Sequence, residues 1–403
     1  MQGKKISRKL YGIYSRGRSI MKKKVLLTTT HAGFGGVAKH VIDLAAFINN
    51  QTEWEADIFT GIQKNDLGKE FIKDSHQCFF SKYLVREVNP YYDFMAYREA
   101  YRFLQNHQYH LVHSHGPKSG FIFRRACYKL KIPCIYTHHL VVYRQFDSLL
   151  NPLYKLAEKF ASNWCEKVIV VAEESKRTLS EDNVTPLEKL EVVHNGLRDL
   201  EIKYSRITAR EKLSLTEDDF VLLSTSRLSP PKDPVTLLHA FIHFKKICPK
   251  AKLIFVGDGE LSVKLKGIVS KTEFPNDVLF LGFQKDIDLF LASSDIFVLT
   301  TGKEGLPISI LEAMKYSLPI ISNPVDGVVE EVISGYNGLL CPVGDEYEIS
   351  LCMSKLFEDS YLRYAMGKNG RKLLETKFSA FENYKTITNL YNQLIIRKET
   401  QGI

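Results

Sequence analysis

The sequence predicts an α/β protein built from two doubly wound, Rossmann-like domains that face each other across a cleft. First, its 403 residues exceed what one hydrophobic core usually organises, which favours two domains. Second, short apolar, β-branched runs alternate with helical patterns, which is typical of parallel sheets covered on both faces. Third, these runs form two series, separated by a polar, charge-rich stretch at residues 198–219.

The strands of the first series are expected in KVLLTTT, YHLVHSHG, PCIYTHH, KVIVVAEES and LEVVHNG, and the first of them precedes a helix in VAKHVIDLAAFI. Those of the second series are expected in FVLLSTSRL, KLIFVGDGE, VLFLGF, DIFVLTT and LPIISNP. An amphipathic helix after Glu375 either caps the second domain or packs back on the first. The expected boundaries are a basic extension at 1–24, a first Rossmann-like domain at 25–198, a linker at 199–216, a second Rossmann-like domain at 217–377 and the C-terminal helix at 378–403.

The net charge of +9 comes from one end of the chain. Residues 1–24 contain nine Lys or Arg and no acidic residue, which leaves 46 basic and 46 acidic residues in the remainder. The extension lacks the apolar segment of a secretory signal. It is either a disordered leader or a segment that binds an anionic surface, lipid or nucleic acid. We expect an anionic membrane surface as the partner to test, and no nucleic-acid partner.

The seven cysteines are scattered and form no C-x-x-C pair. Such a set indicates free thiols in a reducing compartment, without a disulfide framework or a zinc site. No apolar run approaches the length of a membrane-spanning helix. The chain is therefore expected in the cytoplasm, with peripheral attachment to the inner face of the cytoplasmic membrane as an option.

The segment HAGFGGVAKH (residues 31–40) places glycines between a strand and a helix. Gly35 and Gly36 either let the backbone approach a phosphate at the helix N-terminus or simply form a tight turn. The spacing is not the G-x-G-x-x-G of dinucleotide-binding proteins. A nicotinamide oxidoreductase is therefore disfavoured.

The segment STSRLSPPKDP (residues 224–234) carries Arg227 and Lys232 on the loop after a strand. These cations suit a diphosphate, Arg through bidentate contact and Lys as a point charge, although a solvated loop has the same composition. The position at a strand end favours the diphosphate, because ligands of open parallel sheets bind beyond the carboxyl ends of the strands.

The segment GKEGLPISILEAM (residues 302–314) contains two glutamates, Glu304 before a predicted helix and Glu312 within it. Pro307 fits the first helical position, and the helix N-terminus favours an anion. Eight helical positions span at most ~12 Å, whereas glycosidase carboxylate pairs lie ~5–9.5 Å apart. The pair is therefore expected to grip two parts of an elongated ligand, unless Glu312 is merely an exposed helix charge.

Together with the flanking SDIFV and LPIISNPVDGVVEEVISGYNGLLCPVGD, this segment resembles the donor-binding half of retaining glycosyltransferases of family four, which have the GT-B fold and act in bacterial surface-polysaccharide synthesis. Glu304 and Glu312 match the E-x7-E signature of that family, and the R-L-x-x-x-K element matches Arg227, Leu228 and Lys232. The GG turn near the N-terminus and the VVHNG element at 192–196 also match. The resemblance spans about residues 25–380.

The resemblance implies a role for each matched residue. The donor would be a nucleoside diphosphate sugar, the acceptor a saccharide or a lipid-linked saccharide, and no cofactor or metal ion would be needed. Arg227 and Lys232 would neutralise the diphosphate, and Glu312 would hold the ribose. Catalytic roles fall to His115 and Glu304, the latter at the transferred sugar. The remaining expected contacts are Gly35, Gly36, Gly305, Leu306, Pro307 and Ile308 at the donor, Phe283 beside Gly282 at the base, and His139 on the acceptor side, with His138 as its rival.

Two alternatives stay open at this stage: a nucleotide-sugar epimerase of the same fold, and a non-catalytic protein that binds sugar nucleotides. A second possible membrane contact is KSGFIFRRACYKLKI (residues 118–132), where Phe121, Ile122 and Phe123 precede Arg124 and Arg125. A buried helix with a solvated basic side explains that segment equally well.

Overall fold

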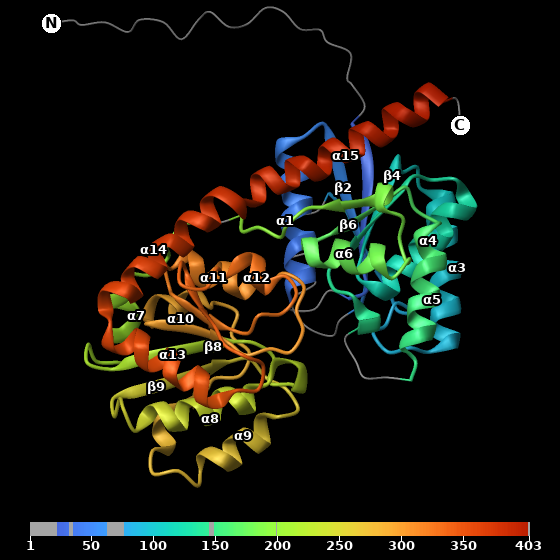
Figure 1. Ribbon diagram of the computed structural model, residues 1–403. Helices are drawn as coiled ribbons and strands as arrows, with labels where there is room; N and C mark the ends of the chain where they lie inside the picture. The colour runs from blue at the N-terminus through green and yellow to red at the C-terminus, as the bar shows by residue number, and fades with distance from the viewer. Residues whose placement is uncertain (1–21, 32–34, 63–75, 145–148, 199, 402–403) are drawn as a thin grey trace, which may run out of the picture.

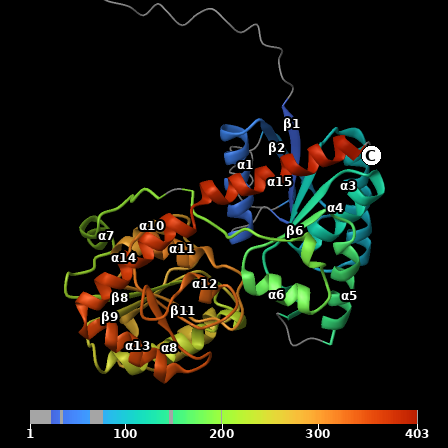
Figure 2. The ribbon, with the colours of Figure 1, turned by 45° about the horizontal axis from the view of Figure 1, so that its top comes forward.

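The computed structural model describes residues 22–31, 35–62, 76–144, 149–198 and 200–401. Two parallel sheets form separate lobes, and the C-terminal helix runs from one lobe to the other (Figures 1 and 2). This arrangement confirms the predicted fold class.

The first sheet has the strand order β3-β2-β1-β4-β5-β6-β7, with every neighbouring pair parallel. Its strands are β1 (Lys23–Thr29), β2 (Trp54–Gly61), β3 (Cys78–Ser81), β4 (Leu111–His115), β5 (Cys134–His138), β6 (Lys167–Val170) and β7 (Leu190–Val192). Its helices are α1 (Gly36–Gln51), α3 (Pro90–Asn106), α4 (Pro117–Leu130), α5 (Asn151–Ser162) and α6 (Glu173–Glu181), with short 3-10 turns η1 (Val142–Arg144) and η2 (Leu187–Lys189).

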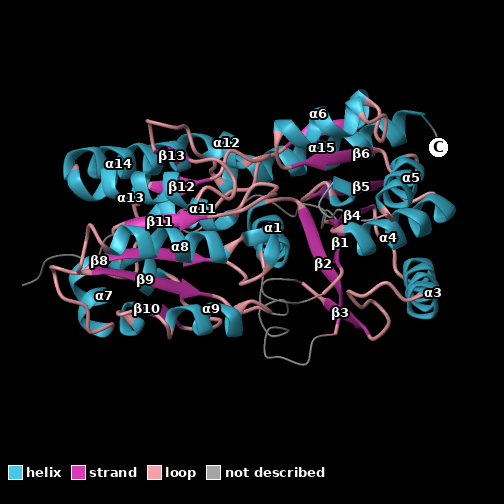
Figure 3. Ribbon diagram, turned by 60° about the horizontal axis from the view of Figure 1, so that its bottom comes forward, coloured by secondary structure: helices cyan, strands magenta, loops and turns pink. Residues whose placement is uncertain are grey.

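The second sheet has the order β10-β9-β8-β11-β12-β13, again parallel throughout (Figure 3). Its strands are β8 (Phe220–Thr225), β9 (Ala251–Val256), β10 (Val278–Phe280), β11 (Ile296–Leu299), β12 (Ile320–Ser322) and β13 (Gly338–Leu340). The helices are α7 (Arg206–Lys212), α8 (Pro234–Lys245), α9 (Ser262–Val269), α10 (Asp288–Ser293), α11 (Ile308–Lys315), α12 (Val328–Glu331), α13 (Glu346–Glu358), α14 (Ser360–Lys377) and α15 (Ala380–Gln401), with the turns η3 (Pro230–Lys232) and η4 (Pro275–Asp277).

Successive side chains of a strand point to opposite faces of its sheet, and helices cover both faces of each sheet. In β1, Val25 and Leu27 join the core under α1 and α15, whereas Leu26 joins the core under α3 and α4. The second sheet alternates in the same way: Leu222 of β8 packs under α8 and α13, and Leu223 packs on the side of α10 and α11.

Helix α15 packs on the first lobe, which was one of the two expected placements. Tyr384, Ile387 and Tyr391 are buried in the same core as α1, β1 and β2. The indole N–H of Trp54 donates a hydrogen bond of 2.9 Å to Asn392, which fixes the helix against β2.

The polar stretch at residues 198–219 connects the two lobes and also contains a helix. Its residues 206–212 form α7, which Ser205 caps by accepting a hydrogen bond from the Thr208 N–H. Arg210 is buried and donates to the Ser293 carbonyl and to Asp295, so α7 is tied to the second lobe.

The structure bears on the two alternatives left open for the segment 118–132. It forms most of α4, in which Ile122 and Phe123 are buried in the core and Arg124 is 0% exposed. Phe121 is exposed, but the burial of the three residues that follow it favours a buried helix over a membrane contact. Arg124 is not solvated either, because it lies in an ion pair with Glu158.

Within the described residues, no helix combines the length and the apolar character that crossing a bilayer requires.

Candidate active site

The carboxyl ends of the strands in the two sheets face each other, and polar contacts join the two lobes there. We call this boundary between the lobes the seam. Lys39 of α1 pairs with Glu312 of α11 at 2.5 Å. The Asn195 amide donates to the Leu306 carbonyl at 2.8 Å, and Lys303 donates to the carbonyl of Arg144. The loops after the strands of both lobes therefore meet at one seam, where a ligand of open parallel sheets is expected.

Glu304 lies in the loop after β11 and is 8% exposed. Its carboxylate is in contact with the ammonium group of Lys232, which follows β8. Burial, and then the positive charge of Arg227, lower the pKa of Lys232 to about 8, while contact with Glu304 favours the charged form. The structure thus brings together two residues that lie 72 positions apart and that were predicted for the same ligand.

Backbone hydrogen bonds hold the Glu304 loop in place. The N–H of Glu304 donates to Asp326 at 3.1 Å, and the N–H of Thr301 donates to Asn323 at 2.7 Å. The N–H of Gly302 donates to the Pro231 carbonyl at 3.0 Å, which ties the loop to η3 and hence to Lys232. These hydrogen bonds therefore fix the position of the loop that carries the Glu304 carboxylate.

At Gly305, the backbone of the Glu304 loop lies very close to the backbone of the first lobe. A β-carbon on Gly305 would lie 2.0 Å from the carbonyl oxygen of His139, so only glycine fits. Gly36, after the GG turn, faces Ile308: a β-carbon there would lie 3.5 Å from the Ile308 side chain. Gly35 precedes α1 as its N-cap, and its carbonyl accepts the Lys39 N–H at 3.1 Å.

Helix α11 starts one residue later than expected. Pro307 is its N-cap and Ile308 its first residue, because ψ of Pro307 is 114°, outside the helical range. Leu306 and Leu311 are buried in the core, whereas Ile308 is only half-buried beside the first lobe. The positive end of α11 still points into the seam, where an anion is stabilised.

Glu312 is not a solvated helix charge. Its side chain is 14% exposed and its partner Lys39 comes from the other lobe. Although burial opposes it, the Glu312 carboxylate raises the pKa of Lys39, so the ammonium group of Lys39 is charged at neutral pH. Because Glu304 lies in the preceding loop, the two glutamates are held by two different structural elements.

Arg227 is exposed on the loop after β8. Burial lowers the pKa of His31 in the first lobe, and the positive charges of Arg86 and Arg227 lower it further. Phe283 follows Gly282, which has φ of +64° and whose carbonyl accepts the Gly257 N–H at 2.8 Å. Phe283 is 48% exposed beyond β10, at the far edge of the second sheet.

Histidines from three elements meet on the first-lobe side of the seam. His115 ends β4, His139 follows β5, and their Nδ1 and Nε2 atoms lie 3.2 Å apart. The ring of His40 in α1 is tilted against that of His115 and meets that of His139 edge-to-face, with centroid separations of 5.4 and 5.1 Å. It is therefore His139, and not His138, that contacts His115; His138 is buried beside Tyr136.

These imidazoles are neutral at physiological pH. Burial, and then the neighbouring histidines, lower the pKa of His115 and of His139 well below the usual range. Burial alone lowers the pKa of His40 to about 4. Each neutral ring has one acceptor nitrogen, so the group can receive a hydrogen bond from a hydroxyl of a ligand.

Beneath this group, His113 is a core residue. Its Nδ1 lies 2.6 Å from the Tyr391 hydroxyl and its Nε2 lies 2.7 Å from the Thr137 hydroxyl. Since Tyr391 belongs to α15, the C-terminal helix supports the strand that carries His115.

Nitrogen atoms of His40, His115 and His139 all lie within 4.8 Å of one another, so these three residues form a group that could hold a metal ion. Among the described residues, both ring nitrogens of His40 and the Nε2 of His115 are buried without a hydrogen-bond partner.

Several residues of the site were missed in the sequence. Lys39 and His40 lie in the quoted HAGFGGVAKH segment, one helical turn beyond the glycines, and that spacing was the available signal. Glu330 of α12 accepts from His194 at 2.8 Å and from the Glu173 N–H at 2.7 Å across the seam. No local pattern marks Glu330.

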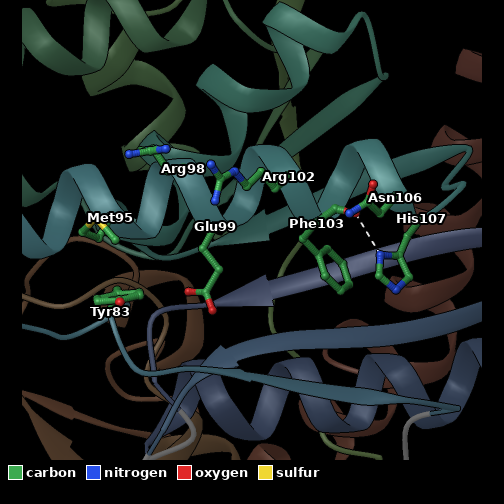
Figure 4. A pocket seen from close by; sticks show the side chains of 8 residues that line it. All are labelled: Tyr83, Met95, Arg98, Glu99, Arg102, Phe103, Asn106 and His107. Carbon is green, nitrogen blue, oxygen red and sulfur yellow. Dashed lines mark hydrogen bonds between the residues drawn. The ribbon is translucent and has the colours of Figure 1, made fainter.

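A second hollow of about 430 Å³ lies along α3, at the β3 edge of the first sheet (Figure 4). It is lined by Tyr83, Met95, Arg98, Glu99, Arg102, Phe103, Asn106 and His107. The Glu99 carboxylate accepts a hydrogen bond from the Ser81 hydroxyl. This hollow shares no residue with the cleft.

Comparison with known proteins agrees with this geometry. Residues 34–199 match the family described as Glycosyltransferase Family 4, and residues 205–373 match Glycosyl transferases group 1. The chain is 30% identical over 341 residues to UDP-Gal:alpha-D-GlcNAc-diphosphoundecaprenol alpha-1,3-galactosyltransferase of Escherichia coli, covering 82% of this chain and 87% of that protein. It is 27% identical over 300 residues to the capsular polysaccharide biosynthesis glycosyltransferase CapM of Staphylococcus aureus, covering 72% and 78%.

Among solved structures, Anabaena Alr3699/HepE in complex with UDP and glucose matches with a TM-score of 0.78 and 20% identity, over 92% of this chain and 99% of that one. This likeness concerns the fold. Taken with the sequence matches, which cover both lobes, it shows that the chain belongs to glycosyltransferase family 4, with the GT-B fold.

Proposed function

We propose that this enzyme transfers a sugar from a nucleoside diphosphate sugar to a hydroxyl of a saccharide or lipid-linked acceptor, with retention of configuration and without a metal ion. The observation that carries the proposal is the contact between Lys232 and Glu304. It lies where the strand order of the second sheet reverses, between β8 and β11, opposite the histidines of the first lobe.

The diphosphate would lie between the Arg227–Lys232 loop and the start of α11. Lys232 contacts Glu304, and an incoming phosphate would offer its ammonium group a second anionic partner. Arg227, exposed on the same loop, adds a bidentate donor. These fixed charges would stabilise the departing diphosphate in the way that a metal ion does in other enzymes.

The two glutamates would hold the donor at two points. Glu304 would accept hydrogen bonds from hydroxyls of the transferred sugar, next to the reacting carbon. Glu312, held at the seam by Lys39, would accept those of the ribose. Phe283 is the candidate contact of the base.

In the reaction, the bond between the sugar C1 and the diphosphate oxygen breaks, and a bond between C1 and the acceptor oxygen forms on the same face. The acceptor proton moves to the departing diphosphate oxygen. His115, neutral and close to His139, would accept a hydrogen bond from a sugar or acceptor hydroxyl and orient it. The contacts across the seam would help to exclude water and so limit donor hydrolysis.

The relatives indicate which substrates to test first. The Escherichia coli relative is named for UDP-galactose and a diphosphoundecaprenol-linked acceptor. We therefore propose UDP-sugars as donors, and a lipid-linked acceptor at the inner face of the cytoplasmic membrane. The described cysteines are all free, which suits the reducing cytoplasm.

The donor site is tested by a thermal-shift panel of nucleoside diphosphate sugars, because a ligand that binds only the folded protein raises its melting temperature. We expect Glu304→Ala and Lys232→Ala to abolish transfer and leave the fold intact. Lys264→Ala, at an exposed lysine of α9, is the control and should have wild-type activity. Near-wild-type turnover of either site variant would refute the assignment.

Retention, metal independence and transfer itself have separate tests. The anomeric configuration of the product, measured by NMR against that of the donor, must be the same. Activity must persist in EDTA; its loss there, with recovery on adding a metal ion, would instead implicate the three-histidine group. An epimerase would convert the donor without any acceptor, so product formed in the absence of acceptor would refute transfer.

A further inference from the structure

Helix α5 and the two residues before it expose large apolar side chains. Leu149 is 100% exposed, and Leu150, Leu153, Leu156 and Phe160 are each at least half exposed. From the N-cap Leu150 onward, the spacing of three to four residues places these side chains on one side of the helix, and Leu149 directly precedes them. We call these five residues the α5 face. Within the described residues, no other element packs against this stripe closely enough to bury it.

The opposite side of α5 is fixed to the protein, so the apolar residues cannot turn inward. Glu158 accepts two hydrogen bonds from the guanidinium of Arg124, at 2.7 and 2.9 Å. Arg124 also stacks 4.0 Å above the ring of Tyr136 in the core. Lys155 pairs with Asp182 at 2.9 Å.

Exposed cations lie near the α5 face. Helices α4 and α5 carry six Lys or Arg, of which Arg124 is buried against Glu158, Lys118 pairs with Asp93 and Lys155 pairs with Asp182. Lys129 and Lys159 are exposed, and Arg125 stacks over Trp164 at 4.9 Å. Leucines flanked by cations without a free carboxylate are complementary to an anionic lipid surface, in which the leucines insert and the cations meet phosphates.

The turn that precedes α5 in the chain is joined to the Glu304 loop of the second lobe. Turn η1 comes between β5, which leads into His139, and α5. The carbonyl of Arg144, at the end of η1, accepts a hydrogen bond from Lys303 in the Glu304 loop. Leu149 is the fifth residue after Arg144, and α3, α4 and α5 lie side by side on the outside of the first lobe (Figure 1).

We propose that the α5 face docks the enzyme on an anionic phospholipid bilayer, with its leucines in the headgroup–acyl boundary and the mouth of the cleft at headgroup level. This inference rests on the proposed function, because a lipid-linked acceptor has its reactive hydroxyl at that level. The surface is α5, and not the Phe-Arg run of α4 that the sequence suggested.

The test compares wild type with the triple variant Leu149→Asn, Leu153→Asn, Leu156→Asn in vesicle sedimentation. Ile207→Asn with Val263→Asn is the control, because both residues are well exposed but lie on the second lobe. Wild type and control should bind phosphatidylglycerol vesicles at low salt and less at high salt. The triple variant should bind at least about tenfold more weakly, since three apolar side chains no longer leave water. The basic N-terminal extension is the same in every variant, so the difference reports on α5.

Three results would overturn the inference: no binding of wild type at low salt, equal binding of wild type and triple variant, or equal binding to phosphatidylcholine. A concentration-dependent dimer that the triple variant abolishes would assign the face to a second copy, and would also overturn it. The proposed function is scored separately, by donor-induced thermal stabilisation and by transfer to a short-chain acceptor in solution. We expect both to be unchanged in the triple variant, and their failure in wild type would refute the transferase site without affecting the vesicle result.

Discussion

Replacing Gly305 with alanine tests whether the close approach of the two lobes sets the reaction geometry. The added β-carbon would lie 2.0 Å from the carbonyl oxygen of His139 and 3.4 Å from a methyl of Val171. Ordinary contact begins at 3.4 Å, so the loop and the His139 backbone must separate by about 1.4 Å. Gly305 has no left-handed φ, and the substitution therefore tests space alone.

This separation moves Glu304 away from the histidine side of the cleft. A misplacement of about 1 Å in a reacting pair costs on the order of 100-fold in rate, which corresponds to about 2.7 kcal/mol in the activation free energy. We therefore expect kcat of Gly305→Ala to fall about 100-fold. Donor binding, for which we propose Lys232 and Arg227 of the second lobe, should change little.

The assay is initial-rate transfer with varied donor, combined with donor-induced thermal shift on the same samples. Gly302→Ala is the matched control: it lies in the same loop, has no left-handed φ, and a β-carbon there meets nothing within 4 Å. Gly327→Ala, whose β-carbon would lie 1.9 Å from the Gly305 carbonyl, should resemble Gly305→Ala. The reasoning fails if Gly305→Ala keeps the wild-type rate, or if Gly302→Ala loses as much.

Three further predictions concern the residues that support the site. Tyr391→Phe removes the hydroxyl bonded to buried His113, and should lower the free energy of unfolding by about 1–3 kcal/mol in urea, together with a lower transfer rate. Arg124→Met leaves a buried carboxylate unpaired and should cost about 3–5 kcal/mol, whereas Arg125→Met should cost about 1 kcal/mol or less; equal costs would contradict the ion-pair argument. Burial lowers the pKa of His40 to about 4, so the unfolded chain binds this proton first as the pH falls below 6.5. Stability should then drop by up to about 1.4 kcal/mol per pH unit until about pH 4, and urea titrations should show a shallower slope for His40→Gln.

The strands that the sequence revealed are those whose apolar runs are long and unbroken. Strand β2 was missed because Glu55 and Asp57 interrupt its pattern; Asp57 is buried only because the Tyr109 hydroxyl donates to it at 2.7 Å. Strands β3 and β13, of four and three residues, were also missed; their length alone does not explain this, because β7, β10 and β12 have three residues each and were predicted.

Some residues of the candidate site could likewise be predicted from the sequence, and others could not. Glu304 and Lys232 were predictable because each lies in a local motif at a strand end, and the sheet order then brings them together. The Lys39–Glu312 pair joins residues 273 positions apart, and nothing near either residue specifies the other. Arg124 looked like a surface cation because its partner Glu158 comes 34 residues later.

The lobes are joined in two physically different ways, and the difference bears on how a donor enters. The chain crosses between them twice, and the two crossings pair at Leu197 and Ser379, where the Leu197 N–H donates to the Phe378 carbonyl at 3.3 Å. There Phe378 is fully buried. At the cleft mouth, by contrast, the lobes meet through single polar contacts such as Lys39–Glu312, whose lysine is 46% exposed and can exchange its partner for water or a ligand. We therefore expect the cleft to open at this polar seam and to pivot about the Leu197–Ser379 pair, with α15 keeping its place on the first lobe. Small-angle scattering with and without a nucleoside diphosphate would detect this as a smaller radius of gyration in the bound state, and an unchanged radius would argue against opening.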